Sequence, residues 1–335
     1  MKKHIGHDRA FRECINAVST ACQMTRKAQC SALKVAQYTK SDSSPVTATD
    51  FAVQALINRK LGSLYEDISI LAEESSKELK KKTDLVSAIC NMVHFDWQNV
   101  STSELFSAID LGSDKSQKDR YWTLDPIDGT KGFIRGGQYA IALAFIDKGE
   151  VTKAIMGCPN LSFSLDSAPD KVSKTGSIFF SVKGGGSWVI PDDLSTFEPT
   201  QVFSKAEEAS EIKICGSVEP LHSVTKKNDQ IAKALNKKNH KLKIDSQCKY
   251  TIVSRGQADA FIRLPTGRYY IEKIWDHAAG FLIATEAGAV VSDADGKDLN
   301  FSDGEGMLGN KGIVCASSLY HSQIIDKIKE LRLNQ

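Results

Sequence analysis

Two aspartates, Asp125 and Asp128, lie three residues apart in the segment "YWTLDPIDGTKGF" (121–133), where an apolar stretch ends. Pro126 restricts the backbone and disfavours helix at Asp125, so we expect the apolar strand to end there in a turn. Two carboxylates this close repel each other unless they point apart or a cation lies between them. Mg²⁺ prefers oxygen ligands of this kind, and the carbonyl of Ile127 adds another.

The residues after this turn predict an anion site. Gly129 and Thr130 offer backbone N–H groups, and a helix that begins there would hold an anion at its N-terminus. A cation site beside an anion site indicates metal-assisted phosphate chemistry. The alternative is a simple turn, since Asp, Pro and Gly are common in turns for local reasons.

Other carboxylates stand at the ends of predicted elements. Glu73 and Glu74 follow an apolar strand in "LAEES". Asp50 in "VTATD" and Asp276 in "KIWDHAAG" each stand where a helix is expected to begin. Taken singly, these two aspartates are explained as helix N-caps and the glutamates as a solvated strand end. Taken together, their positions agree with a metal site at the aspartate turn.

Three motifs, "LAEES", "WTLDPIDGTKGF" and "WDHAAG", occur in this order and resemble the signatures of the inositol monophosphatase superfamily of Mg²⁺-dependent, lithium-sensitive phosphatases. The superfamily has Gly before the paired glutamates where this chain has Ala72, but the ligand glutamate is intact. The matching layout spans nearly the whole chain. Five further segments resemble the branch of 3′(2′),5′-bisphosphate nucleotidases, which act on adenosine 3′,5′-bisphosphate (PAP): "PVTATD", "SVEPLHS", "IDSQCKY", "AFIRLP" and "EKIWDHAAG".

The resemblance implies two Mg²⁺ ions, with room for a third and weaker one near Glu73. The ligands of the first ion would be Glu73, Asp125 and the Ile127 carbonyl. The ligands of the second ion would be Asp125, Asp128 and Asp276. Two such ions clamp the attacking and leaving oxygens of an in-line displacement. Inhibition by Li⁺, and in some members by Na⁺, is implied as well.

The resemblance also assigns the attacking water to Thr130 and Asp50. Thr130 would accept a hydrogen bond from the water while Asp50 accepts the threonine proton. The nucleoside and its 5′-phosphate would be surrounded by His222, Ser246, Lys249 and Arg263. Gly129, Thr130 and Asp276 complete the substrate contacts.

Each nucleotide-binding residue also has a plainer interpretation. His222 would be a histidine whose hydrogen bonds are satisfied at a helix end. Lys249 would be a solvated lysine, and Arg263 would be a charged residue on an edge strand. Lys and Arg are nevertheless natural partners for a phosphate that must be held without being cleaved.

Three other functions are compatible with these motifs. Inositol polyphosphate 1-phosphatase would use the same metals, but "DSQCKY" with Lys249 and Arg263 favours a nucleotide. A catalytically silent phosphate-binding regulator would have lost at least one ligand, and none is lost. A regulated enzyme resembling fructose-1,6-bisphosphatase ranks last, since no allosteric nucleotide segment is recognised. The sequence leaves open the preference for 3′- or 2′-phosphate, the degree of sensitivity to Li⁺ and Na⁺, the rates, and any activity on the sulfated nucleotide PAPS or on inositol 1,4-bisphosphate.

The pattern of predicted elements indicates an α/β or α+β fold, and the resemblance implies a layered αβαβα sandwich. Helices are expected over 8–30, 50–64 and 276–287. Hairpins are expected over 139–159 and 177–190, with the glycines of 184–186 at a bend and not in a phosphate loop. We expect an N-terminal region (1–200) with most metal ligands and a C-terminal region (201–335) with the nucleotide-binding residues.

Composition excludes several classes of protein. The net charge of +2 is too balanced for a general nucleic-acid binder, and no apolar run approaches the ~20 residues of a membrane span. None of the eight cysteines forms a CxxC pair, so we expect reduced, mostly buried thiols in a cytoplasmic protein. The expected partner is therefore a small bisphosphate nucleotide, with neither nucleic acid nor membrane. The oligomeric state is not readable from the sequence, although a monomer is slightly favoured.

Overall fold

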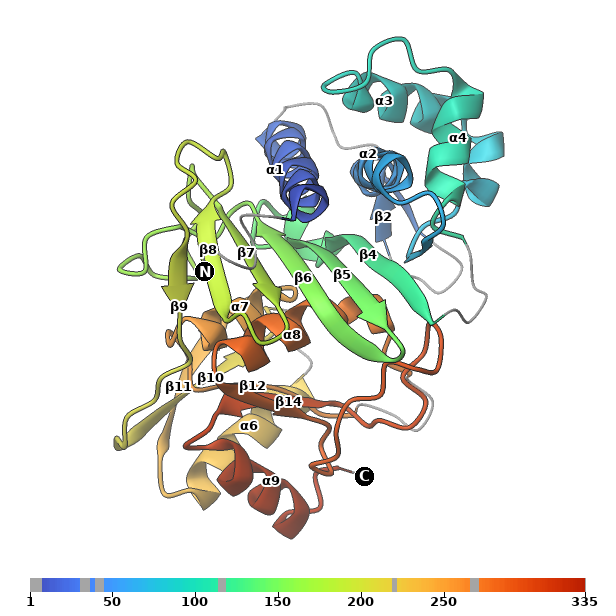
Figure 1. Ribbon diagram of the computed structural model, residues 1–335. Coiled ribbons are helices and arrows are strands. Elements are labelled where there is room, and N and C mark those ends of the chain that lie inside the picture. Colours follow the sequence, from blue (N-terminus) through green and yellow to red (C-terminus); the bar gives the residue numbers. More distant parts are fainter. Residues whose placement is uncertain are drawn as a thin grey trace.

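The computed structural model describes residues 8–30, 37–39, 45–113, 119–218, 222–265 and 271–334. Its described part forms five layers, with two sheets separated by one helical layer and covered by two others (Figure 1). This arrangement confirms the expected αβαβα sandwich. The helices are α1 (Arg9–Cys30), α2 (Ala48–Leu64), α3 (Thr83–Val93), α4 (Thr102–Asp110), α5 (Thr130–Ile134), α6 (His222–Ala234), α7 (Cys248–Ser254), α8 (Ala278–Glu286) and α9 (His321–Glu330), with 3₁₀ turns η1 (Ser76–Lys81) and η2 (Ile274–Asp276).

The larger sheet has seven strands in the order β3-β4-β5-β6-β7-β8-β9. Strands β3 and β4 are parallel, and every later pair of neighbours in this sheet is antiparallel. Both predicted hairpins are present, as β5–β6 and β7–β8. The strands are β3 (Ser69–Ala72), β4 (Arg120–Asp128), β5 (Ala140–Asp147), β6 (Glu150–Cys158), β7 (Ser177–Val182), β8 (Ser187–Pro191) and β9 (Thr200–Val202).

The smaller sheet has five strands in the order β11-β10-β12-β14-β13. Strand β10 runs parallel to both β11 and β12, while β14 runs antiparallel to β12 and β13. The strands are β10 (Glu211–Gly216), β11 (Lys238–Lys243), β12 (Ala260–Arg263), β13 (Ala289–Ser292) and β14 (Ile313–Ser317). A separate two-stranded ribbon joins β1 (Gln37–Thr39) to β2 (Pro45–Thr47).

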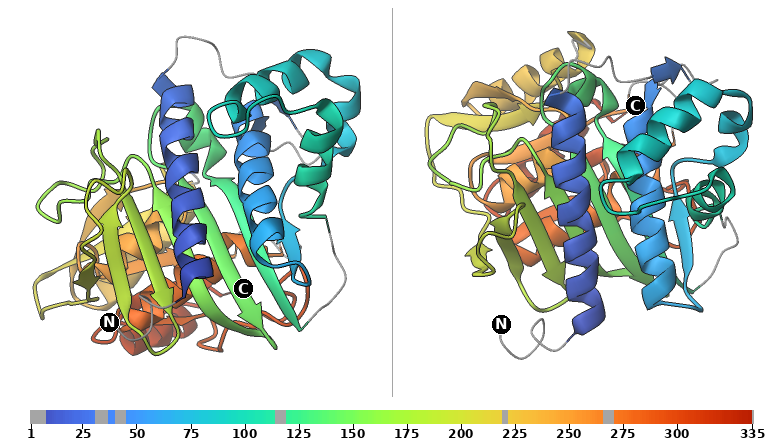
Figure 2. Two further views of the ribbon diagram at one scale, coloured as in Figure 1. Left: turned by 45° about the horizontal axis from the view of Figure 1, so that its top comes forward. Right: turned by 90° about the horizontal axis from the view of Figure 1, so that it is seen from above.

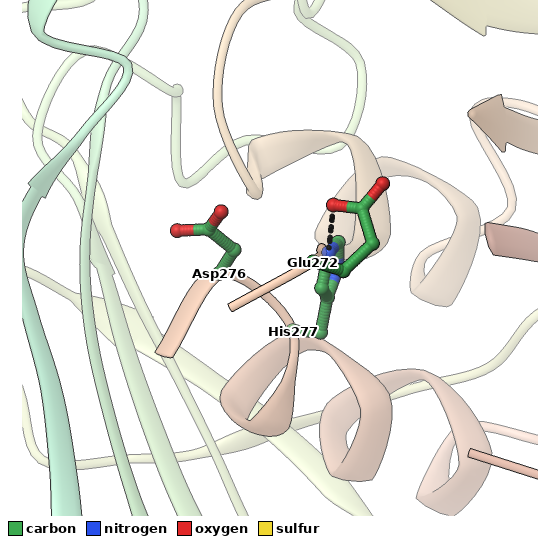
Figure 3. Close-up of side chains that lie close together, drawn as sticks. All are labelled: Glu272, Asp276 and His277. Carbon is green, nitrogen blue, oxygen red and sulfur yellow. Dashed lines mark hydrogen bonds and ion pairs between the residues drawn. The ribbon is translucent and has the colours of Figure 1, made fainter. Parts of the chain in front are cut away.

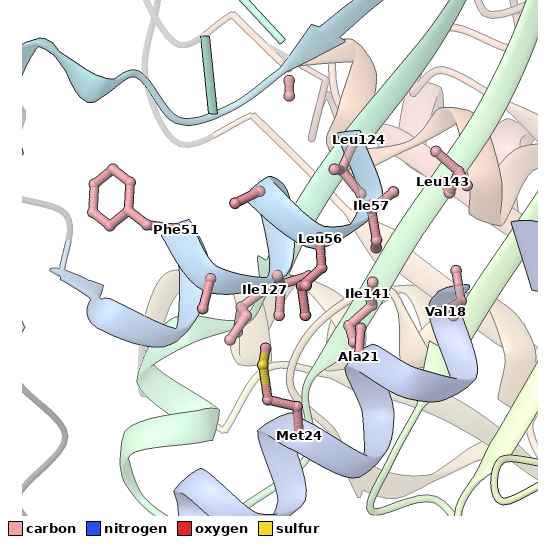
Figure 4. Packing of buried hydrophobic residues seen from close by; sticks show 14 of the residues in the cluster. Val18, Ala21, Met24, Phe51, Leu56, Ile57, Leu124, Ile127, Ile141 and Leu143 are labelled. Atoms are coloured by element: carbon pink, nitrogen blue, oxygen red, sulfur yellow. The ribbon is translucent and has the colours of Figure 1, made fainter. Parts of the chain in front are cut away.

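Three hydrophobic cores fill the spaces between the layers. Helices α1 and α2 lie side by side on the outer face of the larger sheet (Figure 2), and their apolar side chains pack onto β4 and β5 (Figure 4). The second core lies between the two sheets around α7 and α8, and the third lies beneath α6 and α9. Helix α2 is buried on most sides because helices flank it in addition to the sheet.

Small residues in "DHAAG" allow α8 to lie close to α7. A Cβ atom added at Gly280 would come within 2.2 Å of the Tyr250 ring, so only glycine fits there. The segment that carries Asp276 is therefore held in the centre of the sandwich.

The glycines of 184–186 form the bend between β7 and β8, as expected. The backbone N–H groups of Gly184 and Gly186 donate to the Glu286 carboxylate at 2.7 and 2.8 Å. A carboxylate of the protein thus occupies the amides that a phosphate would need.

All eight cysteines are described and are free thiols, six of them buried. This matches the expectation of mostly buried, reduced cysteines. In the described part of the chain, we find no helix whose length and apolar character would allow it to cross a membrane.

Candidate active site

The two aspartates of the β4 turn project from one face of the larger sheet. Asp125 pairs with Ala142 of β5 and Asp128 pairs with Ala140. The two aspartates are three residues apart on β4, while their partners are two residues apart on β5, so β4 contains a bulge. Side chains of cross-strand partners point to the same face, and residues two apart on a strand share a face. The irregularity thus places both carboxylates on the face toward α8. It also corrects the expectation that the strand ends at Asp125, because β4 continues through a bulge to Asp128.

The carboxylates around this bulge repel one another, and of the four only Asp125 is buried, while Glu73, Asp128 and Asp276 are half-buried. Burial raises the pKa of Asp125 well above its ordinary value, and the charges of Glu73 and Asp128 raise it further. Burial likewise raises the pKa of Asp276, with Asp128 as the next cause. Asp125 is only 2% exposed. The structure therefore brings the four predicted carboxylates into one electrostatic cluster.

Glu73 lies at the end of β3, where helix α2 supports the backbone. Its N–H donates to the Leu124 carbonyl on the neighbouring strand. The Gln54 side chain accepts from the Glu74 N–H at 2.9 Å and donates to the Glu74 carbonyl at 2.7 Å. Glu74 is buried, so the glutamate pair is not a solvated strand end. Gln54 was not singled out from the sequence, since only the folded chain brings it to this turn.

Asp50 and Thr130 lie together, as the resemblance implied. Thr130 Oγ1 is 3.4 Å from Asp50 Oδ1 and 3.1 Å from the Ile127 carbonyl oxygen. Asp50 Oδ2 accepts from the Thr47 N–H at 2.9 Å and from its hydroxyl at 2.6 Å. Thr47 is the N-cap of α2, so Asp50 is the third residue of a capping box and not the cap itself.

Gly129 precedes α5 in the left-handed conformation, with φ of +84°. A Cβ atom there would come within 2.8 Å of the Ser246 Cβ. Ser246 also has a positive φ, of +68°. The anion turn at Gly129 and Thr130 thus packs directly against the predicted nucleotide-binding segment, and the Gln247 N–H donates to Asp128 Oδ2.

One pocket of about 340 Å³ is lined by predicted residues from both halves of the chain, although Asp50, Asp125 and Ile127 are not among its lining residues. Its metal-ligand candidates are Glu73, Asp128 and Asp276, and its phosphate-binding candidates are Ser246, Lys249 and Arg263. Gly129 and Thr130 also line it. Residues separated by more than a hundred positions in the sequence therefore face the same space.

Lys249 is not a solvated lysine. It is 6% exposed, its Nζ donates to the Ile244 carbonyl at 3.2 Å, and its charge lies 5.2 Å from the centre of the Phe261 ring. Burial lowers the pKa of Lys249, while the charge of Asp128 opposes this shift. Lys249 in turn lowers the pKa of Asp128, which burial raises. The ammonium group thus partly compensates the carboxylate cluster.

Arg263 is not a charge on an edge strand, because β12 lies at the centre of the smaller sheet. Its Nε atom pairs with Glu272 Oε1 at 2.9 Å. Glu272 and His277 were quoted from the sequence only as parts of "EKIWDHAAG". His222 is the first residue of α6, and its side chain lies outside the described residues.

In the described part of the chain, one group brings three ligand atoms within 4.8 Å of one another: Glu272, Asp276 and His277 (Figure 3). His277 uses both ring nitrogens on protein partners, since Nε2 lies 2.9 Å from Glu272 Oε2 and Nδ1 lies 3.0 Å from the Tyr250 hydroxyl. Glu272 is also paired with Arg263. Of this group, only Asp276 belongs to the cluster around Asp125, which is the better candidate for a cation.

Comparison with known proteins places this geometry in context. A model of the inositol monophosphatase family matches residues 9–333. A 3′(2′),5′-bisphosphate nucleotidase of Dictyostelium discoideum is 38% identical over 322 residues, covering 94% of this chain and 95% of the relative. A 3′,5′-bisphosphate nucleotidase 2 of Arabidopsis thaliana is 35% identical over 342 residues and covers 97% of both chains.

Solved structures share the fold at lower sequence identity. An IMPase of Thermotoga maritima has a TM-score of 0.63 at 18% identity, covering 95% of this chain and 96% of its own. CysQ of Bacteroides thetaiotaomicron, described as a bacterial member of the inositol monophosphatase family, has a TM-score of 0.60 at 17% identity, covering 91% and 96%. These similarities confirm the fold class that the resemblance implied.

Proposed function

The chain belongs to the inositol monophosphatase family, and on this premise we propose that it is an enzyme that removes the 3′-phosphate of PAP, leaving AMP and inorganic phosphate. The choice of substrate is supported by relatives named 3′(2′),5′-bisphosphate nucleotidase, which match over most of both lengths. The observation that carries the proposal is the pocket, where carboxylates suited to a cation and two basic side chains suited to a phosphate face one space.

The carboxylate cluster fits a divalent cation. Asp125 Oδ1 is buried and has no hydrogen-bond partner in the described part of the chain. A buried anionic oxygen without a partner is costly, and a cation offsets that cost. The proposed ligands of two Mg²⁺ ions are Glu73, Asp125, Asp128, Asp276 and the Ile127 carbonyl, all of them hard oxygen donors. When bound, Mg²⁺ would stabilise the charge that develops on the phosphate and activate a water.

Thr130 and Asp50 are proposed to guide the proton of the attacking water. The Thr130 hydroxyl would accept a hydrogen bond from the water and donate its own proton to Asp50 Oδ1, which lies 3.4 Å away. The two hydrogen bonds from Thr47 hold the other carboxylate oxygen and orient Asp50. Helix capping explains the bonds between Thr47 and Asp50 but not the contact between Asp50 and Thr130. This second contact therefore supports a catalytic role for the pair.

The two basic side chains that line the pocket, Lys249 and Arg263, are proposed to hold the 5′-phosphate. Arg263, Lys249 and Ser246 all line the pocket, and Ser246 packs against the Gly129 turn. Binding this second phosphate would help to orient the 3′-phosphate over the carboxylates, so binding energy contributes to the rate. A substrate without a second phosphate should therefore react more slowly.

The decisive experiment measures phosphate release from PAP, 3′-AMP and inositol 1,4-bisphosphate, each with Mg²⁺ and with a chelator. We expect PAP to have the highest kcat/KM and all activity to require the metal. A higher kcat/KM for inositol 1,4-bisphosphate would instead favour a polyphosphate 1-phosphatase. Absence of turnover with all three substrates, together with binding of PAP, would favour the silent phosphate-binding protein. PAPS is added as a fourth substrate to test whether the sulfated nucleotide is cleaved.

A further inference from the structure

Glu272 is a buried carboxylate that the proposed chemistry does not use. It is only 4% exposed, and its two oxygens contact two different side chains. Oε1 pairs with Arg263 Nε at 2.9 Å, and Oε2 lies 2.9 Å from His277 Nε2. Burial tends to raise the pKa of Glu272, but the bonds to His277 and Arg263 outweigh burial and lower it. Glu272 is therefore held as an anion between the two side chains.

The backbone around Glu272 is fixed by residues 305–307. The Glu272 carbonyl accepts from the Met307 N–H at 2.9 Å, and the Ile274 N–H donates to the Glu305 carbonyl at 3.0 Å. Lys273 forms a bridge with Gly306 between these bonds. The carboxylate is thus placed before any ligand arrives.

His277 continues the contact toward the pocket wall. With Glu272 ionised, Nε2 donates to Glu272 Oε2, and Nδ1 lies 3.0 Å from the Tyr250 hydroxyl, within hydrogen-bond distance. The Tyr250 ring packs edge-on against Phe261, with ring centres 5.1 Å apart. Tyr250, Phe261 and His277 all line the pocket. One hydrogen-bonded chain therefore runs from Arg263 to Tyr250 along the pocket wall.

The contact at Nε determines how Arg263 presents its guanidinium group. Nε and the two terminal nitrogens are coplanar, so a partner at Nε limits the rotation of the whole plane. Recognition of phosphate by arginine depends on this plane, because two parallel N–H···O bonds need a defined orientation. The Arg263 side chain is long and 39% exposed, so its contact with Glu272 helps to fix the direction in which the guanidinium group faces the pocket.

We propose that Glu272 is a positioning residue for substrate specificity: it orients Arg263 toward the second phosphate of a bisphosphate nucleotide and ties it through His277 to the segment that carries Asp276. This inference rests on the proposed function, and it adds a residue that acts through Arg263 and touches neither substrate nor metal. Glu272 should therefore matter for substrates with two phosphates and much less for substrates with one.

The test compares kcat/KM on PAP and on 3′-AMP for a set of variants. Glu272→Ala should lower kcat/KM on PAP by roughly tenfold to a hundredfold, the usual effect of losing one charged hydrogen bond, with little change on 3′-AMP. Glu272→Gln should retain most of the preference, because its amide oxygen can accept from Arg263 Nε, while its NH2 group can donate to His277 Nε2 once the imidazole carries its proton on Nδ1. Glu272→Met keeps the volume without the acceptors and replaces the alanine variant if that variant does not fold.

A double-mutant cycle tests whether Glu272 acts through Arg263. The kcat/KM of the double variant E272A/R263A on PAP should be no lower than that of R263A alone. Asp192→Ala is the matched control, since Asp192 is another buried carboxylate paired with an arginine, Arg26 of α1. It should lower thermal stability and leave the ratio of PAP to 3′-AMP unchanged.

The outcomes separate this inference from the proposed function. If the wild-type enzyme shows no preference for PAP over 3′-AMP, the proposed function fails first. If the wild-type enzyme and R263A behave as expected but E272A lowers kcat/KM equally on PAP and on 3′-AMP, Glu272 supports only the fold and the inference is overturned. Additive losses in the double variant would overturn it as well.

Discussion

The hydroxyl oxygen of Thr130 lies 3.4 Å from Asp50 Oδ1, although the two residues are 80 positions apart in the chain. Thr47 holds the other oxygen of the same carboxylate through two hydrogen bonds. The helix cap of α2 and the turn after β4 are thereby joined at one carboxylate. A carboxylate fixed in this way is suited to accept a proton from Thr130, which lines the pocket.

The first prediction follows from this contact. Thr130→Val removes the hydroxyl at almost constant volume and should lower kcat on PAP by about 10²–10⁴, the range of general acid–base catalysis, with little change in KM. Thr130→Ser keeps the hydroxyl and should retain most activity. Steady-state kinetics of both variants check this, and a fully active valine variant would remove Thr130 from the mechanism.

The second prediction concerns Asp125, the most central carboxylate. Asp125→Asn should lower the Mg²⁺-dependent rate by orders of magnitude, because it removes a charge that both proposed ions share. The same change should raise the melting temperature in chelator, since burial and the neighbouring carboxylates disfavour the Asp125 anion. Near-wild-type turnover at saturating Mg²⁺ would contradict the metal assignment.

The third prediction is a pH dependence of stability without metal. Burial raises the pKa of Asp125 and Asp276 above the values of the unfolded chain, so the native state binds more protons between the two values. The contribution of these groups to stability is then greatest at low pH and falls as the pH rises through the folded pKa.

Calorimetry in chelator should therefore show that these carboxylates lower the melting temperature as the pH rises from about 4 toward neutrality. Other titrating groups destabilise the protein in acid, which acts in the opposite direction. The informative quantity is therefore the difference in melting temperature between wild type and Asp125→Asn at each pH. Each bound Mg²⁺ ion, at a hundredfold excess over its Kd, should add about 2.7 kcal/mol to the free energy of unfolding at neutral pH and less in acid. If Mg²⁺ stabilises the protein equally at neutral and at acid pH, the carboxylates around Asp125 are not its binding site.

The fourth prediction separates Lys249 from Arg263, which the sequence grouped together. Lys249→Met should cost roughly 1.5–3 kcal/mol on PAP, the range for one charged hydrogen bond. It should also cause a smaller loss on 3′-AMP, because Lys249 compensates the charge of Asp128. Arg263→Ala should affect PAP almost alone. Kinetics on both substrates decide this, and identical substrate profiles for the two variants would refute the distinction.

The fifth prediction concerns lithium. A small hard cation should compete weakly for the oxygen ligands around Asp125, so Li⁺ at roughly tens of millimolar should inhibit in a way that depends on the Mg²⁺ concentration. Phosphate-release assays over a grid of the two ions test this. Full activity across that range would argue against a site of this type.

Local patterns in the sequence were enough to predict much of the framework. The helices at Arg9–Cys30 and Ala48–Leu64 and the hairpins β5–β6 and β7–β8 follow from periodicity and turn residues, which act over short distances. The carboxylates of the candidate site could also be named, because their types and motif spacing are properties of the sequence itself.

The tertiary structure decided how these residues meet. The β4 strand continues past Asp125 because its pairing with β5 accommodates a bulge. The residues of β4 alone do not determine how it pairs with a neighbouring strand. The burial of Lys249 and the contacts of Glu272 with Arg263 and His277 depend on packing between the two sheets. Such contacts join residues from separate elements, and only the folded chain sets their distances and the low-polarity surroundings that make their charges matter.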